Sequence, residues 1–415
     1  MKPQKQTKEN EVFAALDAGS SKVLCLVARP GNEPGSLRIL GIGQAESVGL
    51  EKGCVTNVQE AVASIQRAVR DAQYTADLQI SGVWASIGGG SLVSANCTGQ
   101  TVLRGSEVRT VDVDQVAENA RQSALRAAPP GRDLIKLIEQ GYKCGDVVTD
   151  DPKSLMGPKL ECHVHALYGS ALAAKNLKRC IQRVGLELLN YEPHPWAAAM
   201  AALSETERIC GSVLIDIGAE TTSLIVFSEN RVQFTDVRPW GAELLTRDLA
   251  MVLGIGLDDA ERLKCAVGEC RPSEVLPHEV VQIEQKGGVS RPYLRELVVK
   301  TLSARVRQFF GIYRKLLADA GALEHVELVV LTGGGAMLPG ITDEAAEVLG
   351  RRVRIGIPRE VEGETHVTGR PDAVVAAGLI KCALTESAKG DERAYGVRRG
   401  AGFFGRVKTF FIGDY

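Results

Sequence analysis

The stretch Leu214–Phe227, LIDIGAETTSLIVF, has the composition of two strands joined by a tight turn. Apolar β-forming residues stand on both sides of Gly218–Thr221, where glycine and small polar residues favour a turn. An Asp at the end of the first strand, followed by glycine and two threonines, indicates an anion site. Glycine permits close backbone approach, hydroxyl and turn N–H groups donate hydrogen bonds, and the carboxylate can orient a metal-bound water.

A second copy of this pattern lies near the start of the chain. The segment Leu16–Val27, LDAGSSKVLCLV, has the same order of strand, Asp17, Gly19, Ser20, Ser21 and strand. One such turn is weak evidence, because Asp-Gly turns are common in hairpins. Two copies roughly 200 residues apart predict a duplicated domain that holds one anion between its halves.

Composition sets the broad class. The 415 residues are too many for one hydrophobic core, so we expect two or three units of about 100–200 residues. A net charge of −2 gives no reason to expect nucleic acid as a partner. No apolar run of about 18 residues is present, and the polar start lacks a signal core. Ten scattered cysteines without a CxxC favour reduced thiols in the cytoplasm.

The segment from residue 91 to residue 162 carries neither phosphate motif. An exposed strand, Leu92–Leu103, and a capped helix, Asp112–Ala128, are expected within it. We interpret this segment as an inserted small α+β unit. His163 and His165 fall on one side of a strand, but a third metal ligand is not evident, so we interpret both as structural.

Two further motifs indicate a binding cleft. In NYEPHPWAAAMAAL, Glu192 precedes a helix of small residues, which favour close helix packing, and we add the hypothesis that this carboxylate faces the cleft as a catalytic group. The turn TGGGAMLPGI follows an expected strand, Val326–Leu331. Its glycines, Gly333, Gly334 and Gly335, would bring backbone close to a ribose or α-phosphate, with N–H groups from the following helix.

The last stretch, GFFGRVKTFFIGDY, has an amphipathic pattern. On a helix its apolar side chains fall on one face, and its basic side chains lie off that face. The apolar set is Phe403, Phe404, Val407, Phe410 and Phe411, and the basic set is Arg406 and Lys408. This pattern favours an anionic bilayer surface. Docking on the protein's own core, or on a neighbour, is the other interpretation.

Taken together, the motif order matches the actin/heat-shock ATPase/sugar kinase fold. Within that superfamily the chain resembles the FtsA family of bacterial cell-division proteins, from Val12 to Leu384 and again in the tail. The motifs that carry the resemblance are LDAGSSKV, GCVTNVQEAVASIQRAV, LIDIGAETTS, WGAELLTRDLA with the following DAERLK, and VVLTGGGAMLPGI. The inserted unit and the amphipathic tail sit where that family carries its small subdomain and its membrane anchor.

The resemblance implies an α/β fold of two duplicated, doubly wound actin-like domains, with an inserted small α+β subdomain and a C-terminal amphipathic helix. The expected units are a disordered arm (1–11), the first domain (12–90 and 163–208), the inserted subdomain (91–162), the second domain (209–255 and 307–368) with a small outer subdomain (256–306), a return helix (369–384), a linker (385–401) and a membrane-targeting helix (402–415).

The resemblance also implies that ATP and Mg²⁺ bind in the cleft. Asp17 and Asp216 would act as catalytic carboxylates and hold the metal through water. The residues implied to contact phosphates are Gly19, Ser20, Ser21, Lys22, Gly218, Thr221 and Thr222. The three glycines of the late turn would line the nucleoside, and Glu261 and Lys264 would flank the adenine.

The implied partners are those of a division protein. Family members polymerise with themselves at the cytoplasmic side of the bacterial inner membrane, anchor FtsZ filaments to the lipid surface at the division site, and recruit later division proteins through the inserted subdomain. Arg295, Arg305 and Arg307 fall where the family binds the acidic C-terminal peptide of FtsZ. A solvated charged face is an equally simple interpretation of these arginines.

The second phosphate turn departs from the family pattern of Gly-Gly-Gly-Thr. Ala219 and Glu220 replace two glycines, and Ser223 stands where an Asp is common. The Glu220 carboxylate should repel phosphates unless Mg²⁺ or Lys22 compensates. We therefore expect nucleotide binding with at most weak ATPase activity. Alternatives on the same fold are an actin-like scaffold of type IV pilus assembly and a sugar or acetate kinase.

Overall fold

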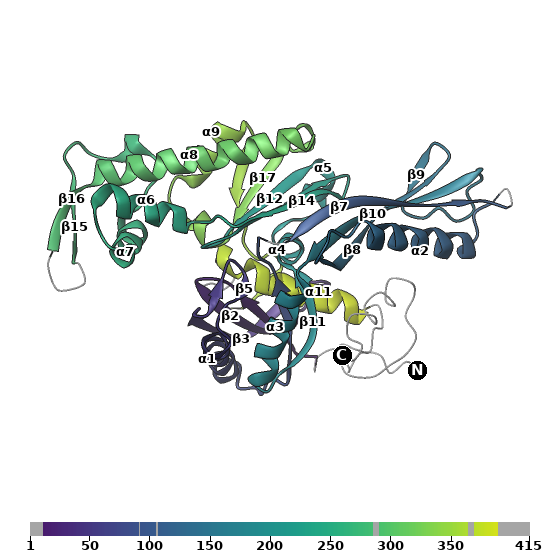
Figure 1. The fold of residues 1–415 in the computed structure, drawn as a ribbon, viewed down its shortest axis with the longest axis horizontal. Coiled ribbons are helices and arrows are strands. Elements are labelled where there is room, and N and C mark those ends of the chain that lie inside the picture. The colour runs from purple at the N-terminus through teal and green to yellow at the C-terminus, as the bar shows by residue number, and fades with distance from the viewer. Residues whose placement is uncertain (1–10, 91, 105–106, 285–289, 364–368, 389–415) are drawn as a thin grey trace.

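Two mixed β-sheets that share the same order over five strands form the two halves of the molecule, and the first sheet has β19 as a sixth strand (Figure 1). The computed structural model describes residues 11–90, 92–104, 107–284, 290–363 and 369–388. The first sheet has the order β11 (Glu187–Pro193), β6 (Gly82–Ile87), β1 (Phe13–Ala18), β2 (Lys22–Pro30), β3 (Leu37–Glu46) and β19 (Val361–Glu362). The second has the order β18 (Arg352–Ile355), β17 (Leu328–Thr332), β12 (Ser212–Ile217), β13 (Thr222–Ser228) and β14 (Arg231–Arg238).

The central strands β1 and β12 have equivalent neighbours. Each pairs antiparallel with the next strand in sequence and parallel with the strand on its other side. Both strands are buried along most of their length, as expected for strands covered on both faces. The expected duplication is therefore confirmed.

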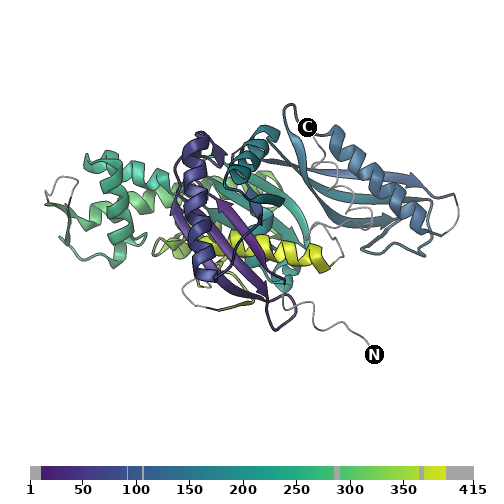
Figure 2. The same ribbon diagram turned by 90° about the horizontal axis from the view of Figure 1, so that it is seen from below.

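Helices form layers on both faces of each sheet. The outer face of the first sheet is covered by α1 (Val58–Ala76) and α3 (Ala171–Arg183). The outer face of the second is covered by α6 (Glu243–Leu253), α7 (Leu257–Val267), α8 (Arg295–Asp319) and α9 (Ile341–Leu349). Between the sheets lie α4 (His194–Ala202) and α11 (Val374–Ala388), so α1 and α11 lie on opposite sides of the first sheet (Figures 1 and 2).

Short elements complete the described chain. They are β4 (Leu50–Glu51), β5 (Cys54–Val55), α5 (Glu205–Cys210), β15 (Val280–Glu284), β16 (Ser290–Leu294) and the 3₁₀ turns η2 (Pro272–Glu274), η3 (Leu323–His325), η4 (Gly334–Met337) and η5 (Pro371–Ala373).

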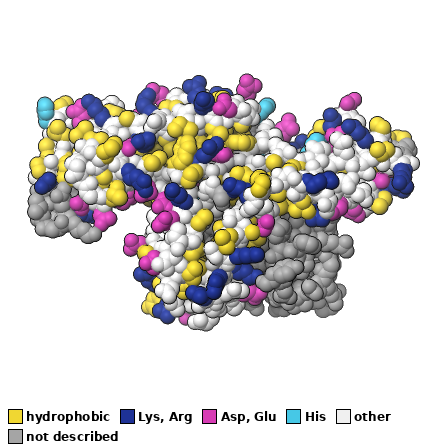
Figure 3. Space-filling model, in the orientation of Figure 1, with side chains coloured by type: hydrophobic (Ala, Val, Ile, Leu, Met, Phe, Trp, Pro, Cys, Tyr) yellow, Lys and Arg dark blue, Asp and Glu magenta, His cyan; other side chains and the backbone are white. Residues whose placement is uncertain are grey.

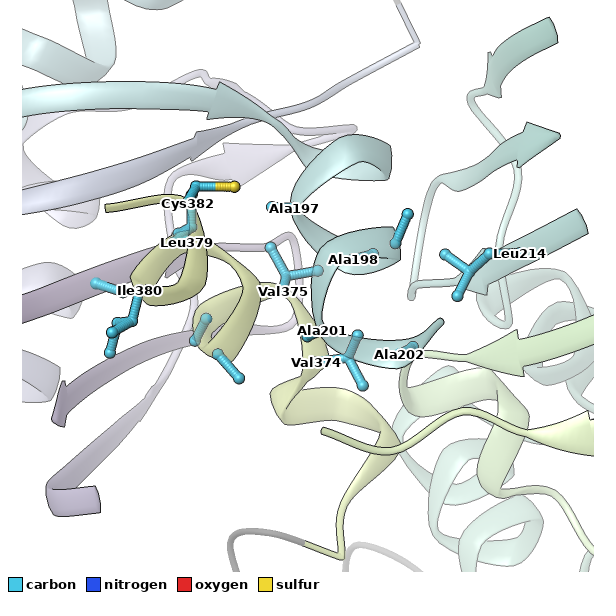
Figure 4. Packing of buried hydrophobic residues seen from close by; sticks show 14 of the residues in the cluster. Ala197, Ala198, Ala201, Ala202, Leu214, Val374, Val375, Leu379, Ile380 and Cys382 are labelled. Atoms are coloured by element: carbon cyan, nitrogen blue, oxygen red, sulfur yellow. The ribbon is translucent and has the colours of Figure 1, made fainter. Parts of the chain in front are cut away.

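Small residues let α4 and α11 pack closely against each other (Figure 4). The contact surface of α4 includes Ala197 and Ala201, and that of α11 includes Val375 and Gly378, all of them buried. A methyl group added at Gly378 would overlap the backbone of Ala197. The glycine therefore sets how close the two helices come, which confirms the expected tight helix interface.

The third sheet belongs to the inserted unit. Its strands are β7 (Val93–Val102), β10 (Lys159–Gly169), β8 (Asp133–Cys144) and β9 (Val147–Thr149), and α2 (Thr110–Arg126) packs on it. The helix begins two residues before the expected Asp112, because that carboxylate accepts the backbone N–H of Arg109 at 3.0 Å and so caps the helix from within its first turn.

Side-chain hydrogen bonds attach the inserted sheet to β14 of the second half. The Ser94 hydroxyl donates to the Thr235 carbonyl at 2.8 Å, and the Asn96 amide donates to the Gln233 carbonyl at 3.0 Å. The buried His165 ring contacts a residue of each strand. Its Nε2 atom lies 3.0 Å from the Thr235 hydroxyl, and its Nδ1 atom lies 2.6 Å from the Asn96 side-chain oxygen. Burial lowers the pKa of His165 to about 4, so the ring is neutral at pH 7.

We expect Gly378→Ala to destabilise the protein by about 2 kcal/mol or more, because overpacking forces α4 and α11 apart. The matched control is Gly311→Ala in α8, where an added methyl meets nothing within 4 Å. That change should stabilise by about 0.5–1 kcal/mol through helix propensity. Chemical unfolding of the two variants measures both effects. Equal stabilisation by both would contradict the packing argument.

Acidification should weaken the folded state through His165. The unfolded chain binds a proton near pH 6.5 and the folded chain only near pH 4, so stability is present above pH 6.5 and is lost as pH falls toward 4. The loss amounts to about 3 kcal/mol at most. Unfolding titrations from pH 7 to pH 4.5 should show this loss of stability in the parent. The control His163→Gln, which replaces a more exposed histidine, should show the same loss. The loss should be smaller in His165→Gln.

Candidate functional site

The two acidic turns are equivalent in backbone geometry. In the first, the Gly19 N–H donates to the Lys22 carbonyl at 3.0 Å, and in the second the Gly218 N–H donates to the Thr221 carbonyl at 2.9 Å. The strand register of the two hairpins agrees as well. Each Asp pairs with the seventh residue after it in its own hairpin, Asp17 with Leu24 and Asp216 with Ser223. The predicted pair of matching hairpins is therefore present in full.

The carboxylates of the two turns converge on one imidazole. His194, the first residue of α4, has Nε2 3.9 Å from Asp17 Oδ1 and Nδ1 3.6 Å from Asp216 Oδ2. The Ser86 hydroxyl donates to Asp17 Oδ1 at 2.7 Å, and the Ser223 hydroxyl lies 3.4 Å from His194 Nδ1. Sequence reasoning did not find His194. The available signal was a titratable side chain between two prolines at the start of an alanine-rich helix.

Burying two ionised carboxylates close together costs free energy unless positive charge lies nearby. Burial raises the pKa of the Asp216 carboxyl above its ordinary value, and the charge of Asp17 adds to the effect while His194 opposes it. The start of α4 contributes only a partial positive charge. Two carboxylates and neighbouring hydroxyls are ligands that hydrated Mg²⁺ prefers, so the donor set fits that ion.

A small cavity of about 50 Å³ separates the two turns. Ser20 and Thr221, two of the residues predicted to contact phosphates, line it together with Ser86, His194 and Ser223. The hydroxyls that line it suit phosphate oxygens.

Four of the predicted phosphate contacts, Ser21, Lys22, Gly218 and Thr222, do not line this cavity. Ser21 is exposed, and Thr222 is buried with its hydroxyl donating to the Trp240 carbonyl at 2.8 Å. The reason is strand alternation, which puts Thr221 and Ser223 on the opposite side from Thr222. The prediction that the Thr222 hydroxyl faces the phosphate site is therefore wrong, because this side chain points away from the cavity.

Lys22 is engaged elsewhere. Its ammonium group pairs with the Asp372 carboxylate and donates to the Asp372 carbonyl at 3.0 Å. Burial acts to raise the pKa of Asp372, but Arg370 and Lys22 outweigh it and hold that pKa below its ordinary value. The expected contact of Lys22 with phosphate is not formed here, and sequence reasoning missed Asp372.

Glu220 makes a contact across the cleft. Its Oε2 atom accepts the backbone N–H of Lys52 at 2.6 Å, which joins the second phosphate turn to the β4–β5 turn of the first half. The carboxylate expected to repel phosphates therefore also holds the two halves together.

The triple-glycine turn lies against the second acidic turn. Gly333 has φ +83°, and a Cβ there would collide with the side chain of Asp216 and the backbone of Ile217. Gly335 packs on the Ile217 side chain, whereas Gly334 is exposed and open. The strand leads into the 3₁₀ turn η4 before α9, instead of directly into a helix.

Glu261 and Lys264 lie together beside the second phosphate turn. Their side chains pair at 2.6 Å, and Lys264 also donates to the Thr246 hydroxyl at 3.0 Å. Burial acts to raise the pKa of Glu261, but Lys264 and Thr246 hold it below its ordinary value. Ala242 links them to the turn, because Lys264 donates to its carbonyl at 3.5 Å and its N–H donates to the Gly218 carbonyl at 2.9 Å.

Glu192 is not part of this cluster, which corrects the expectation that it faces the cleft. Its carboxylate is 2% exposed and pairs with Lys136 of β8 at 2.6 Å. Burial acts to lower the pKa of Lys136, but Glu192 outweighs it and raises that pKa. The strand ends one residue later at Pro193, and the next residue, His194, is the one that reaches the acidic turns.

The three arginines expected to bind a partner are each ion-paired. Arg295 pairs with Glu279 at 3.0 Å, Arg307 with Glu344 at 2.7 Å, and Arg305 with Asp248. Basic and acidic side chains are also interspersed over α8 in Figure 3. The arrangement is therefore a charge-balanced face.

The predicted membrane residues lie outside the described part of the chain; they are Phe403, Phe404, Arg406, Val407, Lys408, Phe410 and Phe411. Within the described residues, none of the helices combines the length and the apolar character that a membrane span requires.

Comparison with known proteins places this chain in a family. Residues 213–389 match the family model "Cell division protein FtsA", and residues 89–168 match the model "SHS2 domain inserted in FTSA". The FtsA of Neisseria meningitidis serogroup B is 31% identical over 91% of this chain and 91% of its own length. The FtsA of Enterococcus hirae is 30% identical over 84% of this chain and 79% of its own.

Solved structures confirm the expected fold class. A chain of a PilM–PilN type IV pilus biogenesis complex has a TM-score of 0.65 at 16% identity and covers 88% of this chain and 97% of its own. MreB 5 of Spiroplasma citri bound to AMPPNP has a TM-score of 0.56 at 14% identity and covers 92% and 99%. At these identities the likeness shows the actin-like fold alone.

We expect Glu220→Gln to tighten binding of Mg-ATP. The amide keeps an oxygen for the Lys52 N–H and removes one negative charge near the phosphates. In a partly hydrated cleft one unit of nearby charge is worth on the order of 1 kcal/mol, or about fivefold in affinity. Glu220→Gly should act in the same direction. Calorimetric titration measures both against the exposed Glu274→Gln control, and weaker or unchanged affinity would contradict the repulsion.

Proposed function

Because the chain belongs to the FtsA family of cell-division proteins, we propose that it is a nucleotide-switched tether that anchors FtsZ filaments to the cytoplasmic side of the bacterial inner membrane. Family membership makes it an actin-like cell-division protein. The observation that carries the finer proposal is the convergence of Asp17 and Asp216, from two equivalent turns, on His194.

In the proposed complex Asp17 and Asp216 hold Mg²⁺ through water. Ser20, Thr221 and the N–H groups of the two turns bind the phosphates. The bound ion supplies positive charge that offsets both the buried carboxylates and Glu220. The residues proposed to surround the nucleoside are Gly333, Gly334, Gly335, Glu261 and Lys264.

Two contacts across the cleft connect nucleotide binding to the arrangement of the halves. Glu220 accepts the Lys52 backbone N–H, and Lys22 donates to Asp372 in the turn η5 that precedes α11. We expect these contacts to rearrange when a nucleotide enters between the two turns. Since Glu192 is engaged by Lys136, it is not positioned as a base, which supports at most a weak ATPase.

The tail and the α8 face supply the proposed attachments. Residues 402–415 place phenylalanines on one face of a helix with basic residues beside them, which suits an anionic lipid surface at the division site. The acidic C-terminal peptide of FtsZ binds near Arg295, Arg305 and Arg307 by displacing their present carboxylate partners. Polymerisation with itself and recruitment of later division proteins by the inserted unit complete the proposal.

The alternatives are less well supported. The pilus-complex chain shares the fold at 16% identity, whereas curated relatives at about twice that identity carry a cell-division name. A small-molecule kinase needs a base carboxylate on the cleft wall, and Glu192 pairs with Lys136 instead.

Vesicle co-sedimentation of the full chain tests the tether. We expect the parent to pellet with vesicles that contain anionic lipid and to lose at least tenfold in affinity when Phe403, Phe404, Phe410 and Phe411 are changed to Ser. The control is Met251→Ser, which alters an exposed apolar side chain on α6. Immobilised FtsZ C-terminal peptide should retain parent and tail variant alike.

Each of the two measurements has an outcome that would contradict the proposal. Equal pelleting of parent and tail variant removes the membrane anchor from the proposal. Failure of the peptide to retain the parent chain removes the FtsZ partner.

A further inference from the structure

A groove lies where β8 of the inserted unit, α4 and α11 come together, away from the acidic turns. Figure 1 shows the C-terminal end of α11 directed toward the inserted unit. The groove has a partly exposed apolar lining made of Ile135, Leu137, Trp196, Met200 and Leu384. Such a surface at the junction of three elements is a suitable site for an apolar segment.

The rim of the groove is acidic. Apart from the buried pair of Lys136 and Glu192, its described lining contains six glutamates against three lysines and arginines: Glu11, Glu33, Glu139, Glu205, Glu360 and Glu386, with Arg208, Arg359 and Lys381. One of these cations, Lys381, is already paired within this set, with Glu360. A ligand with apolar and basic side chains would therefore complement both the lining and the rim.

We propose that this groove is the docking site of residues 402–415 of the same chain. Ala388, the last described residue, itself lines the groove. Residues 389–401 can extend to roughly 40 Å, so the aromatic segment starts within reach of its site. A tether of this length keeps the segment at an effective concentration on the order of millimolar, which allows weak contacts to suffice.

The chemistry of the segment matches that of the groove. Residues 402–415 carry Arg406 and Lys408 against Asp414, and the preceding residues 389–401 carry four lysines and arginines against two acidic side chains, so both are opposite in sign to the rim. The phenylalanines Phe403, Phe404, Phe410 and Phe411 are large apolar groups for the lining. These are the same side chains that the proposed function assigns to lipid. Docking and membrane insertion therefore exclude each other, and the groove holds the tail while the protein is off the membrane.

Hydrogen exchange and vesicle binding of the full chain test this inference, which rests on the proposed membrane role only in its second arm. In the first arm, changing the four phenylalanines to Ser should speed amide exchange at least threefold in residues 135–138 and 196–203. In the second, Met200→Gln with Leu384→Gln should raise affinity for anionic vesicles about fivefold. Met251→Gln on the exposed face of α6 is the matched control and should change neither readout.

The outcomes separate the two proposals. If the tail variant leaves groove exchange unchanged, docking is wrong, even when the parent binds vesicles. If the tail variant exposes the groove while the parent ignores vesicles, docking holds and the membrane role fails. Protection of the groove that depends on protein concentration and not on the phenylalanines would mean that a second copy fills it, which also overturns the proposal.

Discussion

The close contact between α4 and α11 determines how the two halves meet. These helices fill the space between the two sheets, and their approach depends on Ala197 and on Gly378, where even a methyl group has no room. The first residue of α4 lies between the acidic turns, and α11 follows the Asp372 segment that holds Lys22. Helix packing in the core and the placement of charged groups in the cleft therefore depend on the same two helices.

The cleft is an assembly of acidic groups with little positive charge of its own. Asp17 and Asp216 are buried with one imidazole between them, and Glu220 approaches from the turn. The lysine expected to compensate is engaged by Asp372. The electrostatic balance of the cleft therefore leaves room for an added cation, which supports the proposed binding of a nucleotide together with Mg²⁺.

Sequence reasoning succeeded where local composition determines structure. The turns after Asp17 and Asp216 were predicted because glycine and hydroxyl residues specify them within a few positions, and the duplication followed from their repetition. It failed where a role depends on a partner distant in sequence. Glu192 was assigned to the cleft because its partner, Lys136, arrives from the inserted strand, and His194 was missed because its neighbours come from both halves. Strand register, which the composition does not reveal, decided which hydroxyls face the cavity.

The inserted unit is fastened to both halves by different chemistry. A buried ion pair, Lys136 with Glu192, fixes it to the first half, and a row of hydrogen bonds centred on His165 fixes it to β14 of the second. A body held at two points cannot stay at rest when the distance between those points changes. A hinge motion of the halves would therefore have to tilt this unit or break one of its attachments.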